Sequence, residues 1–301
     1  MRVLVTGGTG FIGTALVADL LDSGDEVVIL SRAAHRGGPR CRFIRSLDDL
    51  SGSEQFDAVV NLAGASLAGR RWSAAYKQQI VASRVDTTAA LVRLFERLDH
   101  PPPVLLSASA IGYYGHQGDA ELGEDAATVA GFSQRLCADW EAAALAAQPL
   151  GTRVCQLRLG VVLDRKGSAL QEMARSFRLG VASWAGSGQQ WFSWIHRQDV
   201  IRAMRFLLLR GDLEGPFNLC SPEPVRARAF AEALREHYRV LAGMPVPGVA
   251  MRALFGEMAN ELLLNGQRVV PRALQAAGFE FVYPGVGSAL AEIYSPRVAA
   301  A

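Results

Sequence analysis

Three glycines near the amino terminus constrain this chain more than any other feature. Gly7, Gly10 and Gly13 directly follow a short apolar run and open a stretch with apolar residues at helical spacing. In a strand–turn–helix unit the first glycine permits a tight turn, the second leaves room for a pyrophosphate, and the third lets the helix pack closely on the sheet. The start of such a helix offers free N–H groups and a positive dipole end to phosphates. The pattern therefore predicts a dinucleotide site formed by Gly7, Gly10, Phe11, Ile12 and Gly13.

The end of the next predicted strand distinguishes between NAD and NADP. An NAD site usually has an acidic residue there, bonded to the ribose 2′-hydroxyl. Here the strand ends in Ser31 and Arg32, and its acidic residues, Asp25 and Glu26, lie at its start. Arg32 can bind a 2′-phosphate through two donors and Ser31 can add a hydroxyl, whereas the alternative is a solvated loop charge at Arg32. We therefore predict NADP(H) as the cofactor.

Alternating strand and helix patterns in the first half predict the fold. Strands are expected over residues 3–5, 26–30, 41–45, 57–61, 104–107 and 153–159, with helices over 11–21, 73–98 and 133–147. Such alternation gives parallel βαβ units with helices on both faces of the sheet. We predict an α/β fold with a Rossmann-type doubly wound parallel sheet. The dinucleotide domain should cover residues 1–165, with its sheet completed by parts of 190–220. A smaller substrate-side lobe and C-terminal extension should cover 166–301.

Composition excludes several classes of function. The net charge is only +2 and no basic stripe is present, so we expect no nucleic-acid partner. No apolar run approaches the ~20 residues of a membrane span, and no secretory leader pattern begins the chain. The four cysteines are scattered, without a metal-binding spacing. These features predict a cytoplasmic protein with neither a metal site nor a membrane partner.

The strand predicted over 57–61 is followed directly by Leu62, Ala63 and Gly64. Small residues at that point would let the nucleotide's ring and ribose pass over the strand end. The same pattern also suits a plain strand-to-loop turn, so it supports the cofactor site without establishing it. Further along the chain, His196 is expected to be a core histidine bonded to the backbone. Asp199 is expected to cap a helix that begins near Val200.

The chain resembles the extended short-chain dehydrogenase/reductase superfamily in residues 6–13, 61–64, 107–115 and 194–199, which fall in the expected order. More narrowly, residues 82–88, 113–114, 140–141, 186–189 and 264–269 resemble an "epimerase family protein" subgroup related to NAD-dependent epimerase/dehydratases. The resemblance covers essentially the whole chain and implies NADP(H) binding with a short C-terminal domain, but no known substrate. It also implies cofactor contacts from Gln79 and Arg84. The helices predicted over 73–98 and 133–147 are where such proteins often pair into homodimers.

The catalytic motif of that superfamily is incomplete here. Its members normally combine a Ser or Thr with Tyr-x-x-x-Lys, in which the lysine lowers the tyrosine's pKa and holds the nicotinamide ribose. Ser109 stands where the family places its Ser or Thr, but no tyrosine is followed four residues later by lysine. When Glu141 is aligned with the family's helix glutamate, the tyrosine and lysine positions fall on Ser133 and Cys137.

Two interpretations of the missing motif remain open. In the first, Tyr113 or Tyr114 supplies the phenol beside Ser109. The protein would then be an atypical NADP-dependent oxidoreductase or epimerase acting on an unknown small molecule. In the second, the protein binds NADPH without turnover and acts as a sensor or partner-binding protein. Some relatives are associated with the division of cyanobacteria and plastids, in keeping with the second interpretation.

Overall fold

A computed structural model describes residues 1–295 and divides them into two compact units. The first unit comprises Met1–Tyr113, Ala130–Leu159 and Val200–Phe217. The second comprises Tyr114–Val129, Gly160–Asp199 and the described chain from Asn218 onward. Among residues 1–295, no helix combines the length and apolar character that a membrane span needs.

The first unit is built on a seven-stranded sheet in the order β12-β7-β5-β4-β1-β2-β3. Its strands are β1 (Arg2–Thr6), β2 (Glu26–Leu30), β3 (Cys41–Ile44), β4 (Ala58–Asn61), β5 (Val104–Ala110), β7 (Arg153–Leu159) and β12 (Gly215–Leu219). Adjacent strands from β7 to β3 run parallel. The strand order reverses between β1 and β4, and α/β sheets bind ligands at such a switch point. The predicted α/β class with a doubly wound parallel sheet is confirmed.

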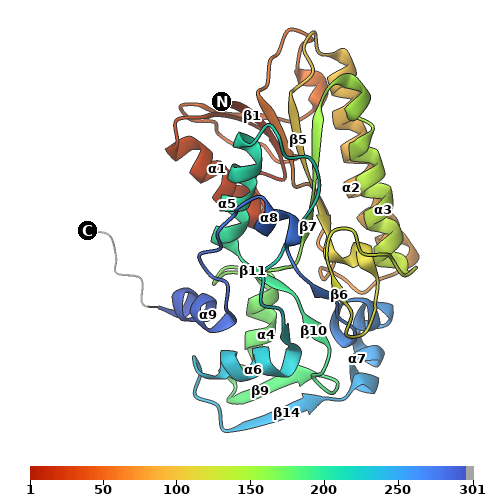
Figure 1. The fold of residues 1–301 in the computed structure, drawn as a ribbon, viewed down its shortest axis with the longest axis vertical. Helices are drawn as coiled ribbons and strands as arrows, with labels where there is room; N and C mark the ends of the chain where they lie inside the picture. The colour runs from red at the N-terminus through yellow and green to blue at the C-terminus, as the bar shows by residue number, and fades with distance from the viewer. Residues whose placement is uncertain (296–301) are drawn as a thin grey trace. The chain divides into compact units, whose positions relative to one another are not determined.

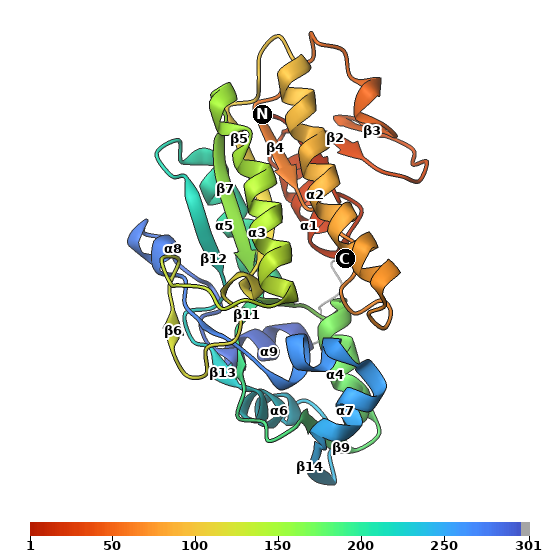
Figure 2. The same ribbon diagram turned by 90° about the vertical axis from the view of Figure 1, so that its right-hand side faces the viewer.

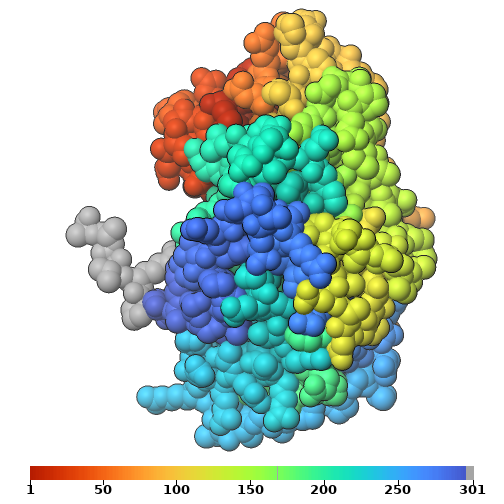
Figure 3. All heavy atoms as spheres, in the orientation of Figure 1, coloured from red at the N-terminus to blue at the C-terminus, as the bar shows by residue number. Residues whose placement is uncertain are grey.

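Helices cover both faces of this sheet. On one face α2 (Ala74–Arg97) and α3 (Phe132–Leu145) lie side by side (Figure 2). Their buried residues pack on Leu4, Val59 and Leu105 of the sheet. On the other face lie α1 (Phe11–Asp22) and α5 (Arg197–Leu209) (Figure 1). Figure 3 shows these two segments in contact at the surface, where Arg205 pairs with Asp19 at 3.2 Å.

Local sequence explains where α2 begins and ends. The Ser73 side chain accepts a hydrogen bond from the Tyr76 backbone N–H at 3.2 Å, which caps the first turn. Three prolines follow shortly after Leu98, so the chain cannot continue as a helix. Between these ends, the buried side chains recur at helical spacing. Tyr76 and Ile80 pack on Leu136 of α3, and the buried residues from Leu91 to Phe95 pack on the sheet.

The second unit has its own apolar core. Phe177, Trp194, Phe230 and Leu290 are buried in it, together with further side chains from the same elements. Its helices are α4 (Ser168–Arg178), α6 (Ala227–Arg235), α7 (Gly248–Phe255), α8 (Arg272–Ala276) and α9 (Val286–Tyr294). Its strands form pairs: β8 (Val161–Leu163) with β11 (Trp194–His196), β9 (Val181–Ala185) with β14 (Ala242–Val246), β10 (Trp191–Phe192) with β13 (Val225–Arg226), and β6 (Glu121–Leu122) with β15 (Arg268–Val269).

Candidate functional site

The carboxyl ends of β1 and β4 are joined by polar contacts in the first unit. The Thr6 hydroxyl donates to Oδ1 of Asn61 at 2.6 Å, and the Leu62 backbone N–H donates to the Thr6 carbonyl at 3.0 Å. Both Thr6 and Asn61 are buried. These bonds place the start of the segment 62–64 beside the glycine loop.

The glycine loop leaves no room for side chains at two of its positions. Gly7 has a φ of +69°, and a Cβ there would lie 2.5 Å from the Leu62 carbonyl oxygen. A Cβ on Gly13 would lie 2.1 Å from the Gly7 carbonyl oxygen. Both distances are far below van der Waals contact, so only glycine fits. The loop thus brings its backbone close to β4 and packs the start of α1 tightly against the turn.

The start of α1 is open to a ligand. Gly10 is the N-cap residue of α1, and no side chain caps the helix there. Phe11 and Ile12 in the first turn are half-buried. An uncapped helix start with glycine at the cap is the arrangement that accepts a phosphate, because backbone N–H groups and the helix dipole both favour an anion. The residues present therefore fit the pyrophosphate of a dinucleotide.

At the end of β2, Ser31 is buried and Arg32 is exposed. Arg32 forms no ion pair with any residue in the part of the chain that the structure describes. A pocket of about 630 Å³ opens beside the neighbouring residue Leu30. Arg45, in the loop after β3, and Asp86, on α2, lie in its wall. The strand end that selects between NAD and NADP thus combines an unpaired guanidinium with an adjoining cavity.

Arg84, on α2, is a buried cation that contacts the segment after β4. Its guanidinium donates to the Ile80 carbonyl at 3.1 Å and to the Ala65 carbonyl at 3.0 Å. It lies so close to Gly64 that a Cβ on that glycine would approach its Cζ to 3.0 Å. Burial lowers the pKa of Arg84. Within residues 1–295 no carboxylate forms an ion pair with it. Its charge is balanced by carbonyl dipoles and by the Trp140 ring, whose centroid lies 5.2 Å from its Cζ. Gln79, on the same helix, is exposed.

Ser109, at the end of β5, belongs to a buried polar group. Its hydroxyl donates to Oε1 of Glu141 on α3 at 2.7 Å. Arg158 on β7 donates to both carboxylate oxygens of Glu141, each at 2.9 Å. All three side chains are buried. The Ser109 proton is therefore directed at Glu141, and Arg158 holds that carboxylate in place.

The two candidate tyrosines lie in different surroundings. Tyr113 is half-buried, and the Cζ atom of Arg158 lies 3.5 Å from its ring centroid, which is a close cation–π contact. Tyr114 is fully buried, and its hydroxyl donates to Oδ1 of Asn218 at 2.7 Å. At the position of the missing lysine, burial raises the pKa of the Cys137 thiol to about 12, so this group is neutral at physiological pH.

Sequence comparison assigns the family. The profile of the NAD dependent epimerase/dehydratase family matches residues 3–220, which include the glycine loop, Arg32, Arg84 and Ser109. The chain belongs to this family. A second profile, for a domain of unknown function (DUF1731), matches residues 246–293. The predicted resemblance is confirmed over both segments.

Relatives of this family member match along nearly their whole length. Epimerase family protein Mb2239 of Mycobacterium bovis is 38% identical over 290 residues, covering 96% of each chain. Epimerase family protein SAR0825 of Staphylococcus aureus is 36% identical over 299 residues, covering 98% of this chain and 99% of its own. The crystal structure of human epimerase family protein SDR39U1 with NADPH superposes with a TM-score of 0.88 at 36% identity, covering 98% of this chain and 99% of the human one.

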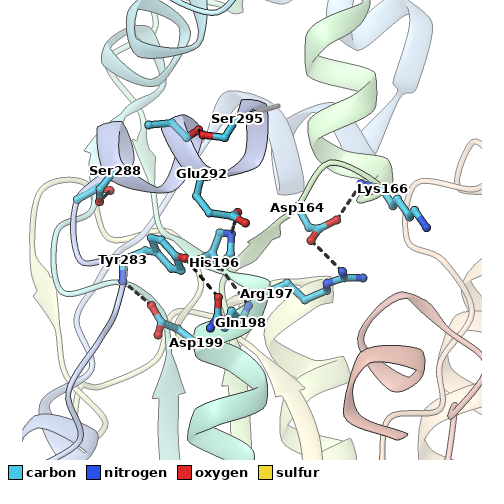
Figure 4. Close-up of polar contacts among 12 residues, drawn as sticks. Asp164, Lys166, His196, Arg197, Gln198, Asp199, Tyr283, Ser288, Glu292 and Ser295 are labelled. Atoms are coloured by element: carbon cyan, nitrogen blue, oxygen red, sulfur yellow. Dashed lines mark hydrogen bonds and ion pairs between the residues drawn. The ribbon is translucent and has the colours of Figure 1, made fainter. Parts of the chain in front are cut away.

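Two further predictions for this epimerase family member concern the second unit (Figure 4). His196 is buried, and its Nδ1 accepts from the Gln198 backbone N–H at 3.2 Å, so the prediction of a core histidine bonded to the backbone is confirmed. Its Nε2 lies 3.0 Å from Glu292 of α9. The predicted capping role of Asp199 is wrong. The helix begins at Arg197, and the Asp199 carboxylate accepts from the backbone N–H groups of Val282 and Tyr283, each at 2.9 Å.

Sequence reasoning missed Arg158 as a member of the polar group around Ser109. A signal was present, because Arg158 is a charge between two leucines, Leu157 and Leu159, in the strand Arg153–Leu159. A charged side chain in a buried strand requires a partner. That partner, Glu141, lies on α3 and was considered only as an alignment landmark.

Proposed function

We propose that this protein binds NADP(H) across the carboxyl ends of β1, β2 and β4 and acts as an oxidoreductase or epimerase on a small molecule. One observation carries the proposal: a glycine loop with no room for a side chain at Gly7 or Gly13 leads into the uncapped start of α1, and Arg32 is unpaired at the next strand end. The human relative, solved with NADPH, supports the same cofactor. The family supports nicotinamide dinucleotide chemistry in general.

Each part of the cofactor has a candidate partner. The backbone of residues 10–13 would hold the pyrophosphate, and Arg32 with Ser31 would hold the 2′-phosphate. The pocket beside Leu30 would take the adenosine end, and Leu62 to Gly64 would line its path across the sheet. Gln79 and Arg84 would contact the cofactor from α2. When bound, NADPH supplies a hydride.

We assign the proton transfer to Tyr113 rather than Tyr114. The hydroxyl of Tyr114 is fully buried and bonded to Asn218, so its role is packing. Tyr113 is half-buried, and its ring is fixed under Arg158. Arg84 would supply the fixed positive charge that the neutral Cys137 cannot. Ser109, through Glu141 and Arg158, would hold this side of the site in place and offer its oxygen lone pairs to the reacting group.

The test is NADPH consumption by the full chain with a panel of small carbonyl compounds. Sugar nucleotides are incubated with NADP⁺ and analysed for the isomerised product, because an epimerase regenerates its cofactor and consumes none. With any substrate found, Tyr113→Phe should lower turnover by about 10²-fold or more, the usual contribution of a general acid. Tyr114→Phe should leave turnover within a few-fold of the parent. Equal loss in both variants, or in neither, would refute the assignment of Tyr113.

A second candidate function is a protein that binds NADPH without turnover and signals the redox state to a partner. Two observations favour it. The Ser109 hydroxyl already donates its proton to Glu141, and the position aligned with the family's lysine holds the neutral thiol of Cys137. Under this candidate, NADPH binds and no compound of the panel is reduced. A partner would then be captured from lysate by the NADPH-bound protein and released when NADPH is replaced by NADP⁺.

We also propose a homodimer formed through α2 and α3. This proposal rests on likeness to the superfamily, whose members often pair through the corresponding helices. In this protein the two helices lie side by side on one face of the sheet (Figure 2). Sedimentation velocity tests it: a single species of the monomer mass, 32.3 kDa, at all concentrations would contradict it.

A further inference from the structure

The second unit contains a pocket of about 440 Å³ that the proposed function does not use. It lies between α4, the residues that follow α6, and the end of α9. Its wall is formed by Arg165, Leu170, Gln171, Arg178, His237, Tyr238 and Tyr294. Pockets that bind small molecules commonly start at about 300 Å³, so its size suits a small ligand.

The pocket carries positive charge without a matching negative charge. None of its described lining residues is acidic. Arg165 and Arg178 are exposed, and neither forms an ion pair with a residue in the described chain. Gln171 and Arg178 are seven residues apart on α4 and therefore lie on one face of that helix. The two guanidiniums are both close enough to Tyr294 to influence its ionisation.

Three acidic residues beside the pocket in sequence, or on its helices, pair with other residues. Asp164, next to Arg165 in the chain, pairs with Arg197 at 2.9 Å. Glu172 on α4 pairs with Arg175 at 2.9 Å. Glu292 on α9 contacts His196 at 3.0 Å. None of these three carboxylates lines the pocket, and none pairs with Arg165 or Arg178.

The tyrosines add a further donor. Tyr238 donates its hydroxyl hydrogen to the Tyr294 oxygen at 2.9 Å, which leaves the Tyr294 hydroxyl hydrogen available. Burial raises the pKa of Tyr294, so this hydroxyl stays protonated. The His237 ring stacks on Tyr294 with centroids 4.9 Å apart and fixes its orientation.

We propose that this pocket binds a small phosphate-bearing molecule, with Arg165 and Arg178 on the phosphate oxygens and the Tyr294 hydroxyl as a third donor. Two guanidiniums match the charge of a phosphate dianion, and three donors from different elements suit its tetrahedral shape. All the residues of this site belong to the second unit, and none of them is assigned to the cofactor.

The test follows the His237 ring by NMR while the full chain is titrated with inorganic phosphate. The pH is held constant and the ionic strength is matched with chloride. His237→Gln assigns the signal among the five histidines. Because the ring lies in the pocket wall, phosphate bound at the glycine loop does not produce this response. We expect a saturable shift in the parent protein. Phosphate affinity should fall by about tenfold or more in Arg165→Gln/Arg178→Gln, which removes both charge-assisted contacts.

Arg175→Gln is the matched control, because Arg175 lies on the same helix but outside the pocket, paired with Glu172. It should retain the parent affinity. Tyr294→Phe, which removes only the hydroxyl, should bind phosphate less tightly while keeping the stacked ring. Absence of a saturable His237 shift in the parent, or equal affinity in the parent and the double arginine variant, would overturn the proposal.

Discussion

Glu141→Gln should be among the most destabilising single changes in the first unit. Glu141 accepts three hydrogen bonds, one from Ser109 and two from Arg158, and the side chains of Arg158 and Glu141 are only 4% and 8% exposed. The substitution keeps the shape but removes the carboxylate that pairs with the buried Arg158 guanidinium. Removing one partner of a buried ion pair typically costs about 3–5 kcal/mol. Ser109→Ala removes one hydrogen bond to a charged group and should cost about 1.5–3 kcal/mol.

The assay is urea unfolding of the full chain, followed by circular dichroism. Glu172→Gln is the matched control, because its exposed pair with Arg175 should contribute less than about 1 kcal/mol. Replacing both partners, Glu141→Leu with Arg158→Met, should recover most of the loss, since no charge then remains buried. A Glu141→Gln protein that unfolds within about 1 kcal/mol of the parent would refute this reasoning.

Three further predictions concern single residues. Gly13→Ala should abolish nucleotide binding in calorimetry, because its Cβ would lie 2.1 Å from the Gly7 carbonyl oxygen. Gly211→Ala is the control: its Cβ would meet no atom within 4 Å, so this variant should bind the nucleotide normally. Iodoacetamide should modify half-buried Cys41 in the folded protein but not Cys137, because burial raises the pKa of the Cys137 thiol to about 12. Mass spectrometry of the labelled protein checks this, and early labelling of Cys137 would contradict it. Burial lowers the pKa of His196 below its ordinary value of 6.5. As the pH falls, the unfolded chain therefore protonates this histidine before the folded chain does, so the stability of the fold should decrease below about pH 6.5. His196→Asn should unfold in urea with a weaker dependence on pH, and an unchanged dependence would contradict the assignment.

The fold could be predicted because its signals are local. Buried strands such as β4 appear in the sequence as short apolar runs. Helix α2 appears as a long amphipathic stretch between a serine cap and three prolines. The glycine loop could be placed because its spacing after a strand is tied to backbone geometry. The structure adds the cause, since the loop's glycines lie against Leu62 and against each other.

The surroundings of the candidate catalytic residues could not be predicted, because they depend on contacts between distant segments. Ser109 and Glu141 are separated by 32 residues, and Tyr114 and Asn218 by 104. Asp199 failed as a cap for the same reason. Its preference for a helix start is local, but the backbone N–H groups it binds belong to a segment more than 80 residues away.

The central claim is that the glycine loop and Arg32 together bind NADP(H), and calorimetric titration of the cofactor-free protein tests it most directly. NADPH, NADP⁺, NADH and NAD⁺ are titrated into the parent, Arg32→Ala and Arg36→Ala, the last being an exposed arginine on the same loop. We expect NADPH and NADP⁺ to bind tightest to the parent and to Arg36→Ala, and Arg32→Ala to lose this preference. Equal binding of all four nucleotides to the parent, or an unchanged preference in Arg32→Ala, would contradict it.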